Sequence, residues 1–474
     1  MLKDILFKSK QNLFLKIIQT ILDSKFLIVF IAMMAAISNL FSLEILCLYT
    51  YLSIVIIAVL FGDDLLCTIP IACCSYYTFS RVNNPLSNEM TSIFLEKKAI
   101  THLIIILVTT AIFAITRLIY DLITKKHAKK FPKLTFGFIA IGITYIIGGI
   151  FSEFYDLKTA FFGFTQIAAI SFCYFYFYYT VDFKKVNNSY FAFLTLVIGL
   201  LLLSEAIGML YFCNFFSSQP FNRYDLYTGW GINNNVAAAI CMILPAPFYY
   251  AYKKNYGFIF LILANIMMFV LLFIQSRNGI LIGTILFIVL YFITLIKSNI
   301  YHRLQLIFTQ VLLLFIFGIL IIEFDQIIAA KLASILSVGT SDNGRFEIYI
   351  DGINQFLNYP FFGNGFYQCN NFRWGNNEIG SFFPARYHNT FIQLLASCGI
   401  VSLIAYFYHR IQTLRIVFSK INTEKLYMFF IFIALALTSI LDCNFFNFGP
   451  GFLYSTILLL VEINNINSKN LKLN

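Results

Sequence analysis

The chain is built from long, continuous runs of apolar residues that are separated by mostly short polar segments. A run of about 20 mostly apolar residues is long enough to cross a lipid bilayer as a helix. We expect such spans near residues 26–42, 44–62, 65–80, 99–120, 134–151, 158–181, 190–213, 233–252, 256–275, 278–297, 304–323, 389–408, 426–442 and 450–463. The runs do not alternate with polar residues, which excludes an outer-membrane β-barrel. The pattern predicts an all-α polytopic membrane protein with about 12–14 transmembrane helices.

Composition supports this class. Of the 474 residues, 60% are hydrophobic and only 12% are charged, and the mean hydropathy is +0.80. Soluble domains carry about 45–50% apolar and roughly 25% charged residues. A water-soluble protein and a disordered chain are therefore excluded.

The charges predict an orientation. The net charge is +11, and 22 of the 33 Lys and Arg fall in the segments that lie inside if the N-terminus is cytoplasmic. An excess of Lys and Arg marks the cytoplasmic loops of membrane proteins. We therefore expect both termini in the cytoplasm, and the loops account for the basic balance without a nucleic-acid partner.

One long polar segment, residues 324–388, interrupts the short connections and faces outward in this orientation. Long connections in compact folds are usually functional or disordered. This one contains Phe346, Ile350, Ile353 and Leu357 at helical spacing, which predicts an amphipathic helix, with Asp342 or Asn343 as its cap. The sequence NYPFFGNG that follows predicts turns. We divide the chain into N-terminal transmembrane helices (1–323), this extracytoplasmic loop (324–388) and C-terminal transmembrane helices (389–474).

Arg277 is the first candidate for chemistry, because it lies in the sequence SRNG where two spans meet at the outer side. An Arg near membrane depth is costly and is a functional candidate by default. Ser276, Asn278 and Gly279 open a helix whose free N–H groups attract anions. An Arg fork at that position suits a phosphate, and the alternative is a simple interfacial anchor.

Four further candidates lie in or beside the long loop. Arg345 begins the amphipathic helix, where a cation is unusual unless it has an anionic partner, either a carboxylate or a ligand. His388 and Asn389 open the next span, and a helix dipole there favours the neutral imidazole that a general base needs. Asn389 is placed to orient that imidazole or hold a substrate hydroxyl, and Arg386 adds a cation beside them. The alternative for His388 is an interfacial residue between Tyr387 and the lipid headgroups.

The remaining polar residues offer less. His102 lies within a span, and His127, His302 and His409 lie on the inner side, where we expect them to be solvated. No phosphate-binding loop and no Cys/His cluster with zinc spacing occurs in the sequence. We expect no metal and no other cofactor.

The order of these candidates, with SRNG, an Arg-led helix, PFFGNGF and His-Asn, resembles the O-antigen ligase and polymerase superfamily of bacterial surface-polysaccharide enzymes. The family marker is His, then Asn, Ser or Gln, nine residues, Gly, two residues, and Gly, Thr or Tyr. Here His388-Asn389, Gly399 and Ser402 match it except at the last position. The match covers about residues 270–410. The departure at Ser402 bears only on how the helix packs at that position.

This resemblance implies a GT-C-like glycosyltransferase fold of the metal-independent kind in the bacterial cytoplasmic membrane. The donor would be a glycan on undecaprenyl diphosphate, and the acceptor would be a sugar hydroxyl on the outer face. His388 would take the proton of that hydroxyl in an inverting displacement. Arg277 and Arg345, with Arg386 as a weaker candidate, would bind the diphosphate. A chain-length regulator is a further partner compatible with such an enzyme.

Three functions remain in competition. The leading hypothesis is a polymerase that joins repeat units of O-antigen, capsule or exopolysaccharide. The alternative is a ligase that transfers the finished glycan to lipid A core or another acceptor. A flippase for the same lipid-linked oligosaccharide is a more distant alternative, since transporters usually show repeat symmetry and midplane charges.

Overall fold

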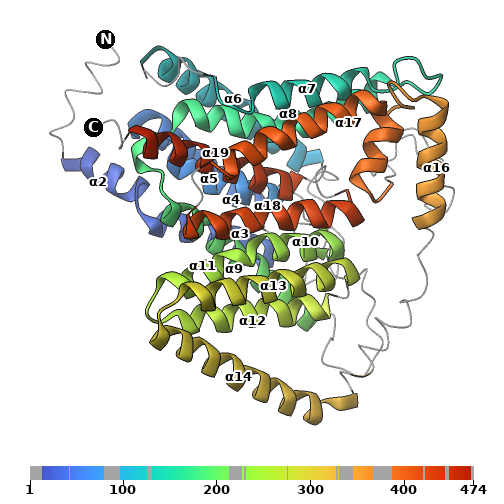
Figure 1. Cartoon of the computed structure of the whole chain (residues 1–474). Coiled ribbons are helices and arrows are strands. Elements are labelled where there is room, and N and C mark those ends of the chain that lie inside the picture. Colours follow the sequence, from blue (N-terminus) through green and yellow to red (C-terminus); the bar gives the residue numbers. More distant parts are fainter. Residues whose placement is uncertain are drawn as a thin grey trace.

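The computed structural model describes residues 13–41, 43–79, 97–124, 131–212, 227–228, 231–274, 276–326, 329, 345–366, 387–419, 422–443 and 448–470. This part of the chain is almost entirely helical (Figure 1). One small antiparallel hairpin joins β1 (Tyr227–Thr228) to β2 (Gly231–Ile232). The predicted all-α class is confirmed.

Every predicted span coincides with at least one helix. The helices of the N-terminal half are α2 (Leu13–Leu22), α3 (Lys25–Phe41), α4 (Glu44–Phe61), η2 (Leu66–Thr68), α5 (Ile69–Phe79), α6 (Lys97–Thr124), α7 (Thr135–Ile147), α8 (Leu157–Thr180), η5 (Phe183–Lys185) and α9 (Asn188–Phe212). Those of the C-terminal half are α10 (Asn233–Ile243), α11 (Pro245–Lys253), α12 (Gly257–Phe273), α13 (Arg277–Lys297), α14 (Ile300–Glu323), α16 (Arg345–Asn358), α17 (Thr390–Val417), α18 (Thr423–Leu441) and α19 (Phe448–Asn470).

Many of these helices can cross a membrane. Eight described helices are long and apolar enough to do so, or nine if the bent pair α2 and α3 counts as one span. Shorter apolar helices add to them, among them Thr135–Ile147 and Gly257–Phe273. The chain is therefore a multi-pass membrane protein, while the count of 12–14 spans stays a prediction.

The predicted inner loops gather at one end of the bundle. Lys185 forms ion pairs with both Asp23 and Asp64. The three residues belong to three different predicted inner segments. The amide of Asn467 in α19 donates to the carbonyl of Phe183 in the same region. In Figure 1, α2 lies at the end of the bundle opposite to α16, the helix of the long loop. These contacts bring the segments around Asp23, Asp64 and Lys185 together at the end of the bundle away from α16, while the orientation of the termini stays a prediction.

The helices differ in how they meet their surroundings. The span over Asn234–Lys253 (α10 and α11) is 89% buried inside the protein, whereas α14 is only 6% buried and lies at the edge of the bundle (Figure 1). Exposed Leu, Ile and Phe side chains on a spanning helix face lipid, which is as apolar as they are. The core is therefore centred on α10 and α11, with α14 as a lipid-facing wall.

One local prediction needs correction. We expected a solvated His409, but His409 is fully buried, with Nε2 3.1 Å from the hydroxyl of Tyr454 and its ring against Phe138. The reason is that α17 continues past residue 408 to Val417, so His409 lies within the helix. The predicted inner segment 1–25 also contains a helix, α2, which bends by 61° into α3.

Candidate active site

The last turn of α18 joins the two predicted motifs. The side-chain amide of Asn278 donates to the carbonyl of Thr438 (3.4 Å), and that of Asn389 donates to the carbonyl of Ile440 (2.8 Å). These carbonyls lie two residues apart on α18, at the end of the bundle where α13 and α17 begin. The starts of the SRNG helix and of the His-Asn helix are therefore anchored side by side on one turn.

Arg277 is the first residue of α13, and the local sequence fixes this start. The hydroxyl of Ser276 accepts a hydrogen bond from the N–H of Gly279 (3.3 Å) and contacts Asn234 Oδ1 (3.0 Å). A Cβ at Gly279 would lie 2.5 Å from the Cβ of Ala237, so only glycine permits this close packing on α10. The half-buried Arg277 thus stands at the positive end of a capped helix.

His388 has an unusual backbone and a carboxylate partner. Its φ is 51°, a left-handed value that is uncommon outside glycine and is often found at functional sites. Its Nδ1 lies 3.3 Å from Oδ1 of Asp442, directly after α18. The hydroxyl of Tyr349 in α16 donates to the carbonyl of His388 (3.3 Å). α16 thereby holds the backbone of His388, and Asp442 after α18 holds its imidazole.

Asp442 is a functional candidate that we did not predict. Burial raises the pKa of Asp442, but hydrogen bonding to His388, the charge of His388, the N–H of Cys443 and the charge of Arg345 together lower it below the usual aspartate value. Asp442 is therefore a carboxylate at neutral pH. Its position was available from the sequence, because it ends a predicted span on the same outer side as His388.

Arg345 lies within electrostatic reach of the same pair. It begins α16, and its positive charge contributes to the lowered pKa of Asp442. The predicted helix of the long loop is confirmed, but the four apolar residues that predicted it are exposed by 47–69%. The opposite face, with Ile348, Gly352 and Gln355, is buried. Arg386 lies outside the described residues.

Asn389 caps the start of α17. Its Oδ1 accepts from the N–H groups of Phe391 (2.9 Å) and Ile392 (3.1 Å), which makes it the N-cap of α17. The cap satisfies two of the free N–H groups at the helix start and fixes the direction in which His388 enters the helix. A role for Asn389 toward substrate stays a prediction.

Tyr387, which precedes His388, is buried in protein, while the alternative of an interfacial His388 between Tyr387 and the lipid headgroups stays open. Tyr387 is 1% exposed and packs with Ile348 of α16 and Ala396 of α17. Its N–H donates to Oε1 of Gln393 (3.0 Å). The residue before His388 is therefore buried in protein, which anchors the histidine from its N-terminal side.

The glycine of the family marker breaks α17. Gly399 has φ 69° and ψ −167°, and the turn at residues 360–365 fills the break. The N–H groups of Asn364 and Gly365 donate to the carbonyls of Ala396 (2.7 Å) and Ser397 (3.0 Å). The hydroxyl of Ser402 lies 2.8 Å from the carbonyl of Gly399 and 2.9 Å from that of Leu394. Serine therefore satisfies the broken turn at the position where it departs from the marker.

We call Gly149, Gly363, Gly365 and Gly399 the glycine clasp. All four have positive φ, and the N–H of Gly149, after α7, donates to the carbonyl of Phe362 (2.6 Å). The side chain of Asn364 contacts Ser152 (2.7 Å) and Gln355 of α16 (2.8 Å). The clasp thus joins α7, α16 and the half of α17 that follows His388.

An apolar groove of about 330 Å³ lies between α12 and α14. It extends from Asn265, whose amide is paired with that of Gln310, to Leu272 and Leu320 near the end where α13 begins. Among the described residues, no three His, Cys, Asp or Glu side chains come together as a metal site.

Comparison with known proteins identifies the region that holds most of these residues. No curated protein matches the chain. Residues 260–407 match the family model described as O-antigen ligase, and they include Arg277, Arg345, His388 and Gly399. Family members of this type are glycosyl-transfer enzymes that use a lipid-linked glycan donor and an acceptor. This match makes the region from residue 260 to residue 407 similar to the O-antigen ligase family.

Proposed function

We propose that the protein is a polymerase of undecaprenyl-diphosphate-linked repeat units of a surface polysaccharide, acting on the outer face of the cytoplasmic membrane. The observation that carries this proposal is the pair of His388 and Asp442, next to Arg345 and anchored on the same turn as the Arg277 helix start. A base beside cations is the arrangement that glycosyl transfer from a diphosphate donor requires.

In the proposed reaction, Asp442 accepts a hydrogen bond from Nδ1–H of His388, which leaves Nε2 free to accept a proton. Nε2 takes the proton of the acceptor hydroxyl as the hydroxyl oxygen attacks the anomeric carbon. The bond from that carbon to the diphosphate oxygen breaks, and the diphosphate leaves with the electron pair. A single displacement of this kind inverts the anomeric carbon.

Arg277 and Arg345 stabilise the charge that develops on the diphosphate, with Arg386 as a third candidate. Guanidinium groups and a capped helix start supply positive charge and fixed donors without a metal. We therefore propose a metal-independent mechanism. Asn389 positions His388 through the N-cap of α17.

Arg277→Lys is expected to lower kcat/KM by about tenfold or more, because an ammonium cannot reproduce a bidentate fork. The measurement is steady-state transfer from a lipid-linked donor. Arg415→Lys is the matched control, because Arg415 is exposed on α17 beyond the break, on the opposite side from His388. Equal rates for the Arg277 variant and the control would remove the diphosphate role of Arg277.

The groove between α12 and α14 is the proposed site of the polyprenyl tail. It is lined almost wholly by apolar side chains, and it leads toward Arg277. Ile266→Trp fills it and is expected to raise KM for a long-tailed donor by about three- to tenfold, with little change for a short-tailed analogue. Ile319→Trp, on α14 outside the groove, is the control; an equal effect of both variants would argue against this site.

Topology follows the same proposal. We place both termini in the cytoplasm, residues 324–388 on the outer side, and the transmembrane helices in 1–323 and 389–474. A cysteine-labelling experiment with an impermeant reagent checks this placement. The test residue is a cysteine introduced in place of the exposed Glu153. If this cysteine were labelled from the cytoplasmic side, the proposed orientation of the chain would be wrong.

A ligase is the second candidate, because the matching family model is described as O-antigen ligase. The test reconstitutes the protein in liposomes with a lipid-linked repeat unit, with or without lipid A core. Growth of a glycan ladder without the core supports the polymerase, and transfer only to the core supports the ligase. Translocation without bond formation, unchanged by His388→Ala, would overturn both in favour of a flippase.

A further inference from the structure

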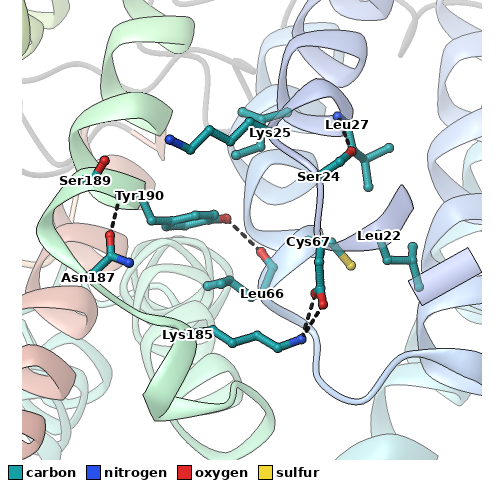
Figure 2. Close-up of a pocket in the computed structure, with 12 residues that line it drawn as sticks. Leu22, Ser24, Lys25, Leu27, Leu66, Cys67, Lys185, Asn187, Ser189 and Tyr190 are labelled. Atoms are coloured by element: carbon teal, nitrogen blue, oxygen red, sulfur yellow. Dashed lines mark hydrogen bonds and ion pairs between the residues drawn. The ribbon is translucent and has the colours of Figure 1, made fainter. Parts of the chain in front are cut away.

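A second cavity lies at the end of the bundle opposite to the candidate active site. Its volume is about 370 Å³, and it is formed where α3 and α9 begin and where η2 turns (Figure 2). One side is polar, with Lys25, Lys185 and Ser189, and the other is apolar, with Leu27 and Ile28. None of these residues belongs to the proposed glycosyl-transfer site.

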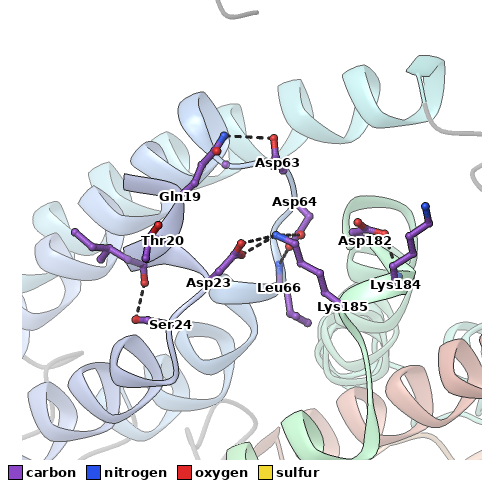
Figure 3. A network of polar contacts seen from close by, with 12 residues as sticks. Gln19, Thr20, Asp23, Ser24, Asp63, Asp64, Leu66, Asp182, Lys184 and Lys185 are labelled. Atoms are coloured by element: carbon purple, nitrogen blue, oxygen red, sulfur yellow. Dashed lines mark hydrogen bonds and ion pairs between the residues drawn. The ribbon is translucent and has the colours of Figure 1, made fainter. Parts of the chain in front are cut away.

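The two lysines of this cavity differ in their partners. Lys185 Nζ is 2.7 Å from both oxygens of Asp23 and 2.9 Å from Asp64, so two carboxylates neutralise it (Figure 3). Lys25 Nζ lies 5.3 Å from the centre of the Phe193 ring. No ion pair joins Lys25 to a carboxylate within the described part of the chain. In Figure 2, Lys25 extends from α3 across the cavity toward α9. Asp23 also lines the cavity, and the charges of Asp23 and Asp64 balance those of Lys185 and Lys25. Among the described residues, Lys25 is the cation of the cavity that has no carboxylate partner.

The neighbouring helix α2 places this cavity at a lipid surface. Leu13, Phe14, Ile17 and Ile21 lie on one face of α2 and are 50–72% exposed. The helix also bends by 61° from α3. A short helix with an exposed apolar face, set at a large angle to a span, is typical of a helix that lies in the membrane interface. The cavity at the bend then lies at the depth of the lipid headgroups.

We propose that this cavity binds the headgroup phosphate of a glycerophospholipid from the leaflet that contacts α2. The ammonium of Lys25 pairs with the phosphate, and the hydroxyl of Ser189 lies on the same polar side to donate to it. The apolar wall at Leu27 receives the first carbons of the acyl chains. The ion pairs of Lys185 hold the opposite wall in place. This inference does not depend on the proposed glycosyl transfer.

The test uses the purified full chain in detergent and counts retained lipids by native mass spectrometry. Phosphatidylglycerol is the probe, and diacylglycerol with the same acyl chains is the phosphate-free comparison. The wild type is expected to retain phosphatidylglycerol and not diacylglycerol. Lys25→Gln is expected to weaken retention by about tenfold, the loss that one charge-assisted hydrogen bond produces.

Lys184→Gln is the matched control, because Lys184 is exposed next to the cavity but does not line it. A second variant, Ser189→Phe, fills the cavity and is expected to lose the lipid without losing Lys25. Bound phosphatidylglycerol is also expected to raise the unfolding temperature of the wild type but not that of Lys25→Gln.

Three outcomes would each overturn the proposal. They are equal retention of diacylglycerol, an equal loss of lipid in Lys184→Gln, and displacement of the lipid by glycerol 3-phosphate at equal concentration. Unchanged glycosyl transfer in Lys25→Gln is expected and separates this site from the catalytic one.

Discussion

His388→Ala is expected to lower the rate of glycosyl transfer by about 10²–10⁴-fold, the usual contribution of a general base. The carboxylate of Asp442 contacts the imidazole, the hydroxyl of Tyr349 bonds the backbone carbonyl of His388, and the N-cap of α17 fixes the residues that follow. Removing the imidazole leaves the cationic groups and the groove intact. Donor binding should therefore persist while kcat falls, and single-turnover kinetics with a lipid-linked donor measures both.

Asp442→Asn is expected to lower kcat by about 10²-fold or more, because an amide facing Nδ1 no longer selects the tautomer with a free Nε2. Glu153→Gln is the control, since it makes the same change of carboxylate to amide at an exposed residue in a turn. If Asp442→Asn retained the wild-type kcat, Asp442 would not position the base.

The lowered pKa of Asp442 also gives a pH dependence. A carboxylate whose folded pKa is below its unfolded value of about 3.9 stabilises the folded state above that unfolded value. The contribution is lost as the pH falls through the folded value. Wild-type protein should therefore lose more stability between pH 5 and pH 3 than Asp442→Asn, in thermal unfolding at about those pH values.

The motifs of this site could be predicted from the sequence because each one is local. A helix start next to Arg277, a helix led by Arg345 and a helix start after His388 all follow from neighbouring residues. That they are anchored on α18 could not be predicted, because the anchors are backbone carbonyls of Thr438 and Ile440 that no side-chain pattern marks. Asp442 was missed for a different reason, since a single carboxylate at the end of a span has no local signature.

The apolar pattern predicted where the helices lie in the sequence, but not which face of each helix is buried against protein. In α16, the residues at helical spacing are exposed, and the buried face is built around Gly352, where a Cβ would lie 2.4 Å from Ile392. In a soluble protein such an apolar stripe would face the core. The face that contacts α17 instead combines Ile348 with Gly352 and Gln355, so the close fit to α17 decides which side of α16 is covered.

Gly399→Ala is expected to lower kcat by about 10²-fold, an effect of the kind that a small displacement of a catalytic group produces. An alanine Cβ at this position would lie 2.3 Å from the carbonyl carbon and oxygen of Phe361, and the backbone at φ 69° and ψ −167°, a region that essentially only glycine adopts, alone costs about 1–3 kcal/mol. Either α17 straightens or the turn at 360–365 leaves the break. Both outcomes move His388 relative to Asp442.

The matched control is Gly318→Ala on α14, where a Cβ would meet nothing within 4 Å. That variant should keep the wild-type rate and unfolding temperature. Gly399→Ala should instead combine a lower unfolding temperature with a lower kcat, while the groove and Arg277 on α12–α14 stay in place, away from the break. A wild-type kcat in Gly399→Ala would show that the glycine clasp does not position the base, since the substitution cannot be accommodated without moving one of its two partners.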